Sequence, residues 1–180
     1  MKARILCLAA LLTLAAGGAR AQYCAVRLNA LGLATGTLNA GIDVAVGPKW
    51  SIDLDLYANP IDAPRLRTRF VAVQPGVRYW FFQPSVGSFI AAHAAYARYN
   101  VGGRNDYFSG WLSGVGLSFG HCWLLSTRWN IDVEIGVGVY RMKDTNRQRS
   151  VPYTEDEYIR HARRWVVAPS KAAVSFSYLF

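Results

Sequence analysis

The segment that decides the fold is Asn130-Ile131-Asp132-Val133-Glu134-Ile135-Gly136-Val137-Gly138-Val139, in which polar or small residues alternate with aliphatic ones. A period of two places one set of side chains on each face of a β-strand. The same pattern recurs in Ser51-Ile52-Asp53-Leu54-Asp55-Leu56 and in the C-terminal Val174-Ser175-Phe176-Ser177-Tyr178-Leu179-Phe180. The only helical candidate after the N-terminal segment is a weak one at 156–165. The chain is therefore predicted to be all-β.

Working outward from this segment, we predict eight antiparallel strands, the smallest usual number for a membrane barrel. They are Ala25–Ala34, Leu38–Val46, Trp50–Asn59, Phe70–Phe81, Ser88–Val101, Ser109–Leu124, Trp129–Arg141 and Pro169–Phe180. Short turns at 47–49, 82–87 and 126–128 alternate with longer polar loops at 60–69, 102–108 and 142–167. Only the first loop, 35–37, is too short for this scheme. Short turns at one end and longer loops at the other are typical of an outer-membrane barrel.

The two faces of these strands differ in composition, and the difference indicates which face lies inside. One face is aliphatic and uninterrupted, whereas the other combines glycines with charges of both signs. A solvated face is seldom rich in glycine, but a narrow lumen favours small residues and paired charges. We therefore predict an up-and-down transmembrane barrel whose lumen is plugged by side chains rather than open to ions. The lumen network is predicted to comprise Arg27, Asp43, Asp53, Asp55, Arg78, His93, Asp132, Glu134 and Lys171.

The N-terminal segment Met1–Ala21 has the features of a secretory signal. Lys2 and Arg4 precede an apolar run at 5–16, and Ala19-Arg20-Ala21 supplies a small-x-small cleavage pattern. Cleavage would leave residues 22–180 as one barrel domain with 17 basic and 11 acidic residues, a net charge of +6. With 52% hydrophobic and 17% charged residues, the composition excludes a disordered chain. A basic exported barrel is expected to meet lipid phosphates rather than nucleic acid.

Cys24 and Cys122 remain after this cleavage, but they have opposite strand parity and lie on nonadjacent predicted strands. We therefore predict no disulfide between them. No Cys-x-x-Cys or His/Cys spacing suggests a metal site, and we expect neither a metal nor another cofactor.

Aromatic residues gather near the predicted strand ends, as in the two girdles of a membrane barrel. They are Trp50, Tyr57, Tyr79, Trp80, Phe81, Tyr96, Trp123, Trp129 and Tyr140. The chain also ends on an alternating strand with Phe176, Tyr178 and Phe180 on its apolar face. This ending resembles the C-terminal signal that the barrel-assembly machinery reads during biogenesis.

The last long loop, 142–167, is the best candidate for a recognition surface. Its candidate contact residues are Arg147, Arg149, Arg160, Arg163, Arg164 and Trp165. Lipopolysaccharide phosphates or a surface protein would be suitable partners for them, although charged loops more often serve only for solvation. We expect a monomer.

A lipid-modifying activity needs a serine activated by a histidine, which is in turn oriented by a carboxylate. None of His93, His121 and His161 has a serine two residues later, the spacing of known outer-membrane deacylases. We therefore predict that the protein is not an enzyme. A lipid A-modifying enzyme and a soluble periplasmic barrel with an apolar ligand inside remain the alternatives.

Six segments together carry a resemblance to a known family, and they are Gly47-Pro48-Lys49-Trp50-Ser51-Ile52-Asp53-Leu54, Val73-Gln74-Pro75-Gly76-Val77-Arg78-Tyr79-Trp80-Phe81, Tyr99-Asn100-Val101-Gly102-Gly103, Gly110-Trp111, Trp129-Asn130-Ile131 and Pro169-Ser170-Lys171-Ala172-Ala173. They resemble a Bacteroidales family of small exported barrels that is catalogued as a domain of unknown function. Members are often encoded near fimbrial genes. The resemblance implies an outer-membrane barrel linked to fimbriae or other surface proteins, and it carries over no catalytic residue.

Overall fold

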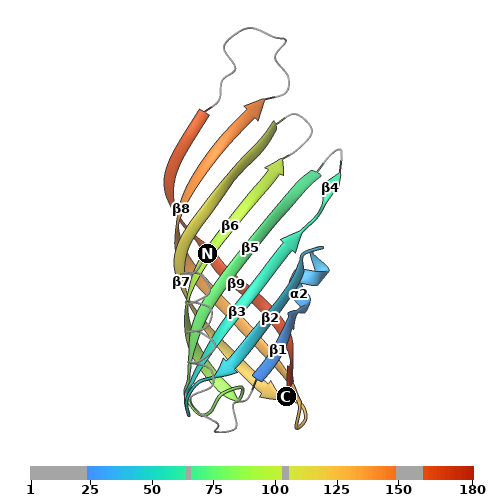
Figure 1. Ribbon diagram of the computed structural model, residues 1–180, viewed down its shortest axis with the longest axis vertical. Coiled ribbons are helices and arrows are strands. Elements are labelled where there is room, and N and C mark those ends of the chain that lie inside the picture. The colour runs from blue at the N-terminus through green and yellow to red at the C-terminus, as the bar shows by residue number, and fades with distance from the viewer. Residues whose placement is uncertain (1–23, 64–65, 103–105, 149–159) are drawn as a thin grey trace, which may run out of the picture.

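The computed structural model describes residues 24–63, 66–102, 106–148 and 160–180, which form an antiparallel barrel (Figure 1). Its long strands are β1 (Cys24–Asn29), β2 (Leu38–Ala45), β3 (Trp50–Asn59), β5 (Leu66–Trp80), β6 (Gly87–Gly102), β7 (Asp106–Leu124), β8 (Trp129–Gln148) and β9 (Arg160–Leu179). The two-residue β4 (Asp62–Ala63) pairs with the start of β5, and α2 (Ala30–Ala34) is a short helix. Successive long strands pair with each other, and β1 pairs with β9 to close the ring. The predicted eight-stranded up-and-down barrel is confirmed.

The strands β5 to β9 extend farther toward the loop end than the sequence suggested (upper part of Figure 1). The loop predicted at 142–167 is wrong at both ends, because β8 continues to Gln148 and β9 begins at Arg160. The helical candidate at 156–165 is wrong from Arg160 onward, and its first part lies outside the described residues. The loops predicted at 60–69 and 102–108 are shortened in the same way. Hydrogen bonds between the backbones of paired strands stabilise these extensions. The extensions can therefore form without the apolar alternation from which a strand is predicted.

The first predicted strand, Ala25–Ala34, is wrong after Asn29, because Ala30–Ala34 forms the helix α2. The Asn29 side chain accepts a hydrogen bond from the Gly32 amide at 3.2 Å and so caps the helix. Asparagine is among the residues preferred at this position, since its short side chain satisfies a free amide of the first turn. The barrel wall therefore stays short at β1 and β2 and rises high at β5 to β9 (Figure 1).

Pro169, predicted to begin the last strand, lies inside β9 at a β-bulge. The register shifts from Gly136 opposite Lys171 to Val137 opposite Pro169, so Ser170 has no residue opposite it. Proline lacks an amide hydrogen and is tolerated at such irregularities. The bulge changes the parity of the strand, which places Lys171 inside the barrel below it.

The two faces of the wall have opposite chemical character. Inward positions hold buried charges, with Arg78 only 1% exposed and Glu134 only 2% exposed. Outward positions hold exposed aliphatic side chains, among them Ile135 at 69%. This is the orientation that the sequence predicted, and it is the reverse of a barrel with an apolar interior.

Aromatic side chains contact one another on the outer wall at the turn end. Trp50 meets Tyr79, and Trp129 meets Tyr178, each with ring centroids 5.0 Å apart. Three residues predicted for the girdles point inward instead, namely Tyr57, Trp80 and Tyr140. They share strand parity with the buried lumen residues, and this parity outweighs their position near a strand end.

Candidate functional site

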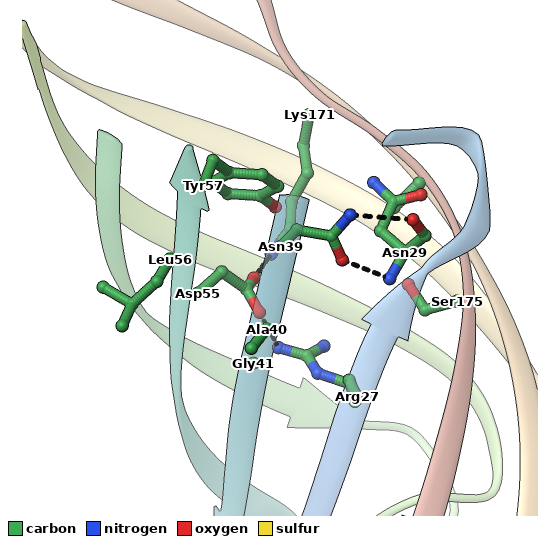
Figure 2. Close-up of a pocket in the computed structure, with 11 residues that line it drawn as sticks. Arg27, Asn29, Asn39, Ala40, Gly41, Asp55, Leu56, Tyr57, Lys171 and Ser175 are labelled. Carbon is green, nitrogen blue, oxygen red and sulfur yellow. Dashed lines mark hydrogen bonds and ion pairs between the residues drawn. The ribbon is translucent and has the colours of Figure 1, made fainter. Parts of the chain in front are cut away.

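A network of ion pairs fills the middle of the lumen. Asp55 on β3 lies between two cations, 2.9 Å from Arg27 Nη2 on β1 and 2.8 Å from Lys171 Nζ on β9 (Figure 2). Arg27 also donates to Asp53 Oδ2 at 3.1 Å. Strands from both sides of the point of closure therefore contribute to one cluster of charges.

Arg78 on β5 joins this cluster to the opposite wall. Its Nη2 donates to Glu134 Oε2 on β8 at 2.7 Å, and its Nε lies 3.6 Å from Asp53 and 3.7 Å from Asp43. The other oxygen of Glu134 lies 3.3 Å from Lys171 Nζ. Three cations and four carboxylates thus form one connected network across the barrel.

Glycines on the inner face make room for these side chains. A β-carbon at Gly41 would overlap the Asp55 carboxylate, and one at Gly76 would lie 2.7 Å from Asp53 Oδ1. The alternation of charged and glycine positions in the sequence therefore has a packing cause, because charges from one strand occupy space left by glycine on another.

The structure brings seven of the nine predicted lumen residues into this network, and they are Arg27, Asp43, Asp53, Asp55, Arg78, Glu134 and Lys171. Asp132 and His93 are also inside, 1% and 4% exposed, but neither belongs to an ion pair among the described residues. His93 lies against Gly116, where a β-carbon would be 2.6 Å from its Nε2 and 2.8 Å from Ser170 Oγ.

The predicted lumen network left out two hydroxyl groups. Ser118 donates to Glu134 Oε1 at 2.6 Å, and strand alternation places it on the polar face together with the neighbouring glycines. Ser170 could not have been found from alternation, since it enters the lumen only because of the bulge in β9.

The two ends of the lumen carry different groups. At the turn end, Trp80, Phe89, Ala91 and Cys122 form a buried apolar cluster, and the Arg78 guanidinium lies 4.5 Å from the centre of the Phe89 ring. Cys122 donates to the Ser85 carbonyl at 3.0 Å, and both it and Cys24 are free thiols. At the loop end, Tyr99 donates to Asp144, which pairs with Arg164 at 3.0 Å.

Little space remains beside the charged side chains. The cavity next to Arg27, Asp55 and Lys171 has a volume of about 10 Å³ (Figure 2). A single water molecule needs at least about this much room. Within the described ranges, no three His, Cys, Asp or Glu side chains are arranged to hold a metal ion.

The candidate contact residues of the last loop lie on strands instead. Arg147 belongs to β8, and Arg160, Arg163, Arg164 and Trp165 belong to β9, whereas Arg149 is outside the described residues. Arg163 and Trp165 face outward, with Trp165 71% exposed. Arg164 shares the parity of the lumen and reaches Asp144 at the rim.

The aromatic C-terminus lies at the closing seam of the barrel. Phe176 and Phe180 are 45% and 73% exposed on the outer wall, and Tyr178 contacts Phe180 with ring centroids 5.0 Å apart. The Phe180 amide donates to the Cys24 carbonyl at 2.9 Å. The last residue is thus fixed to the first strand.

Comparison with known proteins places the chain in a family. Among the described residues, no helix is both long and apolar enough to span a membrane. Searches of curated proteins and of solved structures found no match to the chain. A family model described as "Protein of unknown function (DUF3575)" matches residues 5–180. The chain therefore belongs to the DUF3575 family.

Proposed function

We propose that the protein is an outer-membrane β-barrel with a closed lumen, a structural or surface-interaction component without catalytic activity. The observation that carries this proposal is the apolar outer wall. Val115, Leu117 and Ile135 are 65%, 67% and 69% exposed, and they lie on the paired strands β7 and β8. Soluble monomers rarely expose apolar surface over so wide an area. Contact with lipid acyl chains removes this surface from water.

The height of the apolar wall suits a bilayer. Outward positions on β8 are apolar from Trp129 to Val139, and the next outward residue is Arg141. This stretch measures about 34 Å along the strand. At a strand tilt of about 40° it gives about 26 Å of height, close to the apolar band of known membrane barrels.

Biogenesis follows from the same proposal. Residues 1–21 would direct export and be removed, and Phe176, Tyr178 and Phe180 would serve the barrel-assembly machinery. The start of β1 and the end of β9 lie together at the turn end (Figure 1), which would face the periplasm. The tall ends of β5 to β9 would then face the outside, where lipopolysaccharide and surface proteins are available as partners.

The link to fimbriae rests on the resemblance described above. On this proposal, the loop end of the barrel contacts surface appendages.

A lipid A-modifying enzyme is the second candidate, and one contact favours it. Ser88 Oγ lies 2.8 Å from His121 Nδ1, and both side chains face outward. This pair lies at the turn end, however, whereas lipid A is found in the outer leaflet.

The test is heat-modifiable gel mobility of the full chain, expressed in a bacterium with an outer membrane and extracted from that membrane. We expect a fast-migrating band without boiling that slows after boiling, and an intact mass that begins at Gln22. A soluble periplasmic protein whose mobility does not change on boiling would contradict the proposal.

A further inference from the structure

Four basic side chains occupy neighbouring outward positions near the tall ends of β6, β8 and β9. In one row across the sheet, Arg98 lies opposite Trp111, Trp111 opposite Lys143, and Lys143 opposite Arg163. In the row below, Arg141 lies opposite Trp165. We call Arg98, Arg141, Lys143 and Arg163 the basic patch. Adjacent strands are about 4.8 Å apart. The basic patch spans the three strand spacings from β6 to β9, which is about 15 Å across the sheet.

The charges of the basic patch are not balanced by the protein. Among outward strand positions whose side chains are described, none carries a carboxylate. The nearest acidic residue along β8 is Asp144, which faces the lumen and is held there by Tyr99 and Arg164. Lys143 and Arg163 are directly opposite each other, and like charges in this position destabilise a sheet. A bound anion would remove this repulsion.

The depth of the basic patch indicates what kind of anion fits. Val139 occupies the next outward position below Arg141 on β8. It lies opposite Val167 on β9 and opposite Val115 on β7. These valines are 44%, 71% and 65% exposed and belong to the apolar wall. Cations and valines are thus separated by about 7 Å of strand. A ligand that satisfies both must carry its negative charge directly beside acyl chains.

We infer that the basic patch binds the phosphate groups of a phosphorylated glycolipid of the outer leaflet, with its acyl chains against the valine wall. This inference rests on the proposed location in the outer membrane. Trp111 and Trp165 belong to the same two rows as the basic patch, and indole rings favour the membrane interface. Cations on both sides of Trp111 can each take a separate phosphate, which favours a headgroup with two phosphates over one with a single phosphate.

The test uses the folded mature chain in a zwitterionic detergent, titrated with fluorescent bisphosphorylated lipid A. Lys143→Gln combined with Arg163→Gln removes two charges from the basic patch. Lys49→Gln combined with Arg128→Gln removes two exposed charges from the turn end and is the matched control. We expect the first variant to bind lipid A at least tenfold more weakly and the control to bind like the native chain. The first variant should also unfold at the same or a higher temperature without lipid.

Equal binding by the native chain and the first variant would overturn the inference. Displacement of lipid A by inorganic phosphate at matched phosphate concentration would also overturn it, by identifying a site for free anions. Equal affinity for phosphatidylglycerol would overturn the assignment to a two-phosphate headgroup. Heat-modifiable mobility is measured on every sample. A sample that keeps this mobility but does not bind lipid A contradicts the lipid site alone, whereas a sample without it contradicts the proposed location.

Discussion

The charges inside the barrel and those on its outer wall are arranged in opposite ways. In the middle of the lumen, three cations meet five carboxylates, and most of them pair at 2.7–3.7 Å with almost no exposure. On the outer wall, the strand positions whose side chains are described carry no carboxylate, and Arg98, Arg141, Lys143 and Arg163 lie on neighbouring positions there. The difference teaches that strand alternation separates two kinds of charge. Those of the lumen are neutralised within the protein, whereas those of the basic patch would be neutralised by lipid at the location that we propose.

The largest effect is expected from removing a charge inside. Arg78→Met leaves Glu134 without its closest cation in a dry environment. Breaking a buried pair in this way costs about 3–5 kcal/mol. We expect the free energy of unfolding in urea, measured with the barrel in lipid vesicles, to fall by that amount. The same substitution on the wall, Arg98→Met, should change it by less than about 1 kcal/mol. Similar losses in both variants would mean that the two sets of charges do not differ.

A charge added to the apolar wall tests the outer face itself. Ile135→Arg places a guanidinium in the middle of the wall, where lipid contact makes it cost about 2–4 kcal/mol. Ser113→Arg adds the same group beside Arg141, near the membrane surface, where the expected cost is at most about 1 kcal/mol. Both free energies are measured by urea unfolding in vesicles. If depth made no difference, the wall would not face lipid.

The third effect tests how tightly the inner charges are packed. Gly76→Ala adds a β-carbon 2.7 Å from Asp53 Oδ1 and 3.3 Å from the Ala92 carbonyl oxygen. Such overpacking costs about 1–3 kcal/mol, and it should shift Asp53 away from its cations. Gly47→Ala is the control, since its nearest neighbour would be Trp50 Cβ at 3.9 Å. Thermal unfolding in detergent compares them. An unchanged midpoint for Gly76→Ala would show that the lumen is loosely packed.

Alternation predicted which residues share the lumen, because a period of two is fixed by backbone geometry alone. It placed Asp53, Asp55 and Glu134 on one face, but it could not say which charges would pair. That depends on the register between strands that are distant in sequence. Lys171 illustrates this limit, since it reaches Asp55 only through closure of β1 on β9 and the bulge at Ser170. Asn29 illustrates another limit, because its side chain caps a short helix where alternation predicted the continuation of a strand.

The basic patch was only partly visible in the sequence for the same reason. Lys143 and Arg163 fell within the predicted loop at 142–167, whereas Arg98 and Arg141 come from predicted strands whose register the sequence does not give. Charged residues beyond the apolar alternation were interpreted as a loop, although they continue a paired hairpin. The upper parts of these strands lack the alternation of apolar and polar residues that identifies their lower parts.

The smallest effect is expected from a hydroxyl–imidazole pair on the outer wall, Ser88 with His121 at 2.8 Å. Ser88→Ala removes a single partly buried hydrogen bond, so unfolding should become easier by about 1 kcal/mol. If the pair is only structural, as we propose, the acyl composition of membrane lipids from cells producing Ser88→Ala will match that from cells producing the native barrel. A changed composition, with the variant still heat-modifiable, would instead make Ser88 a nucleophile. The outer wall would then differ from the lumen by catalysis as well as by charge, and the non-catalytic proposal would fail.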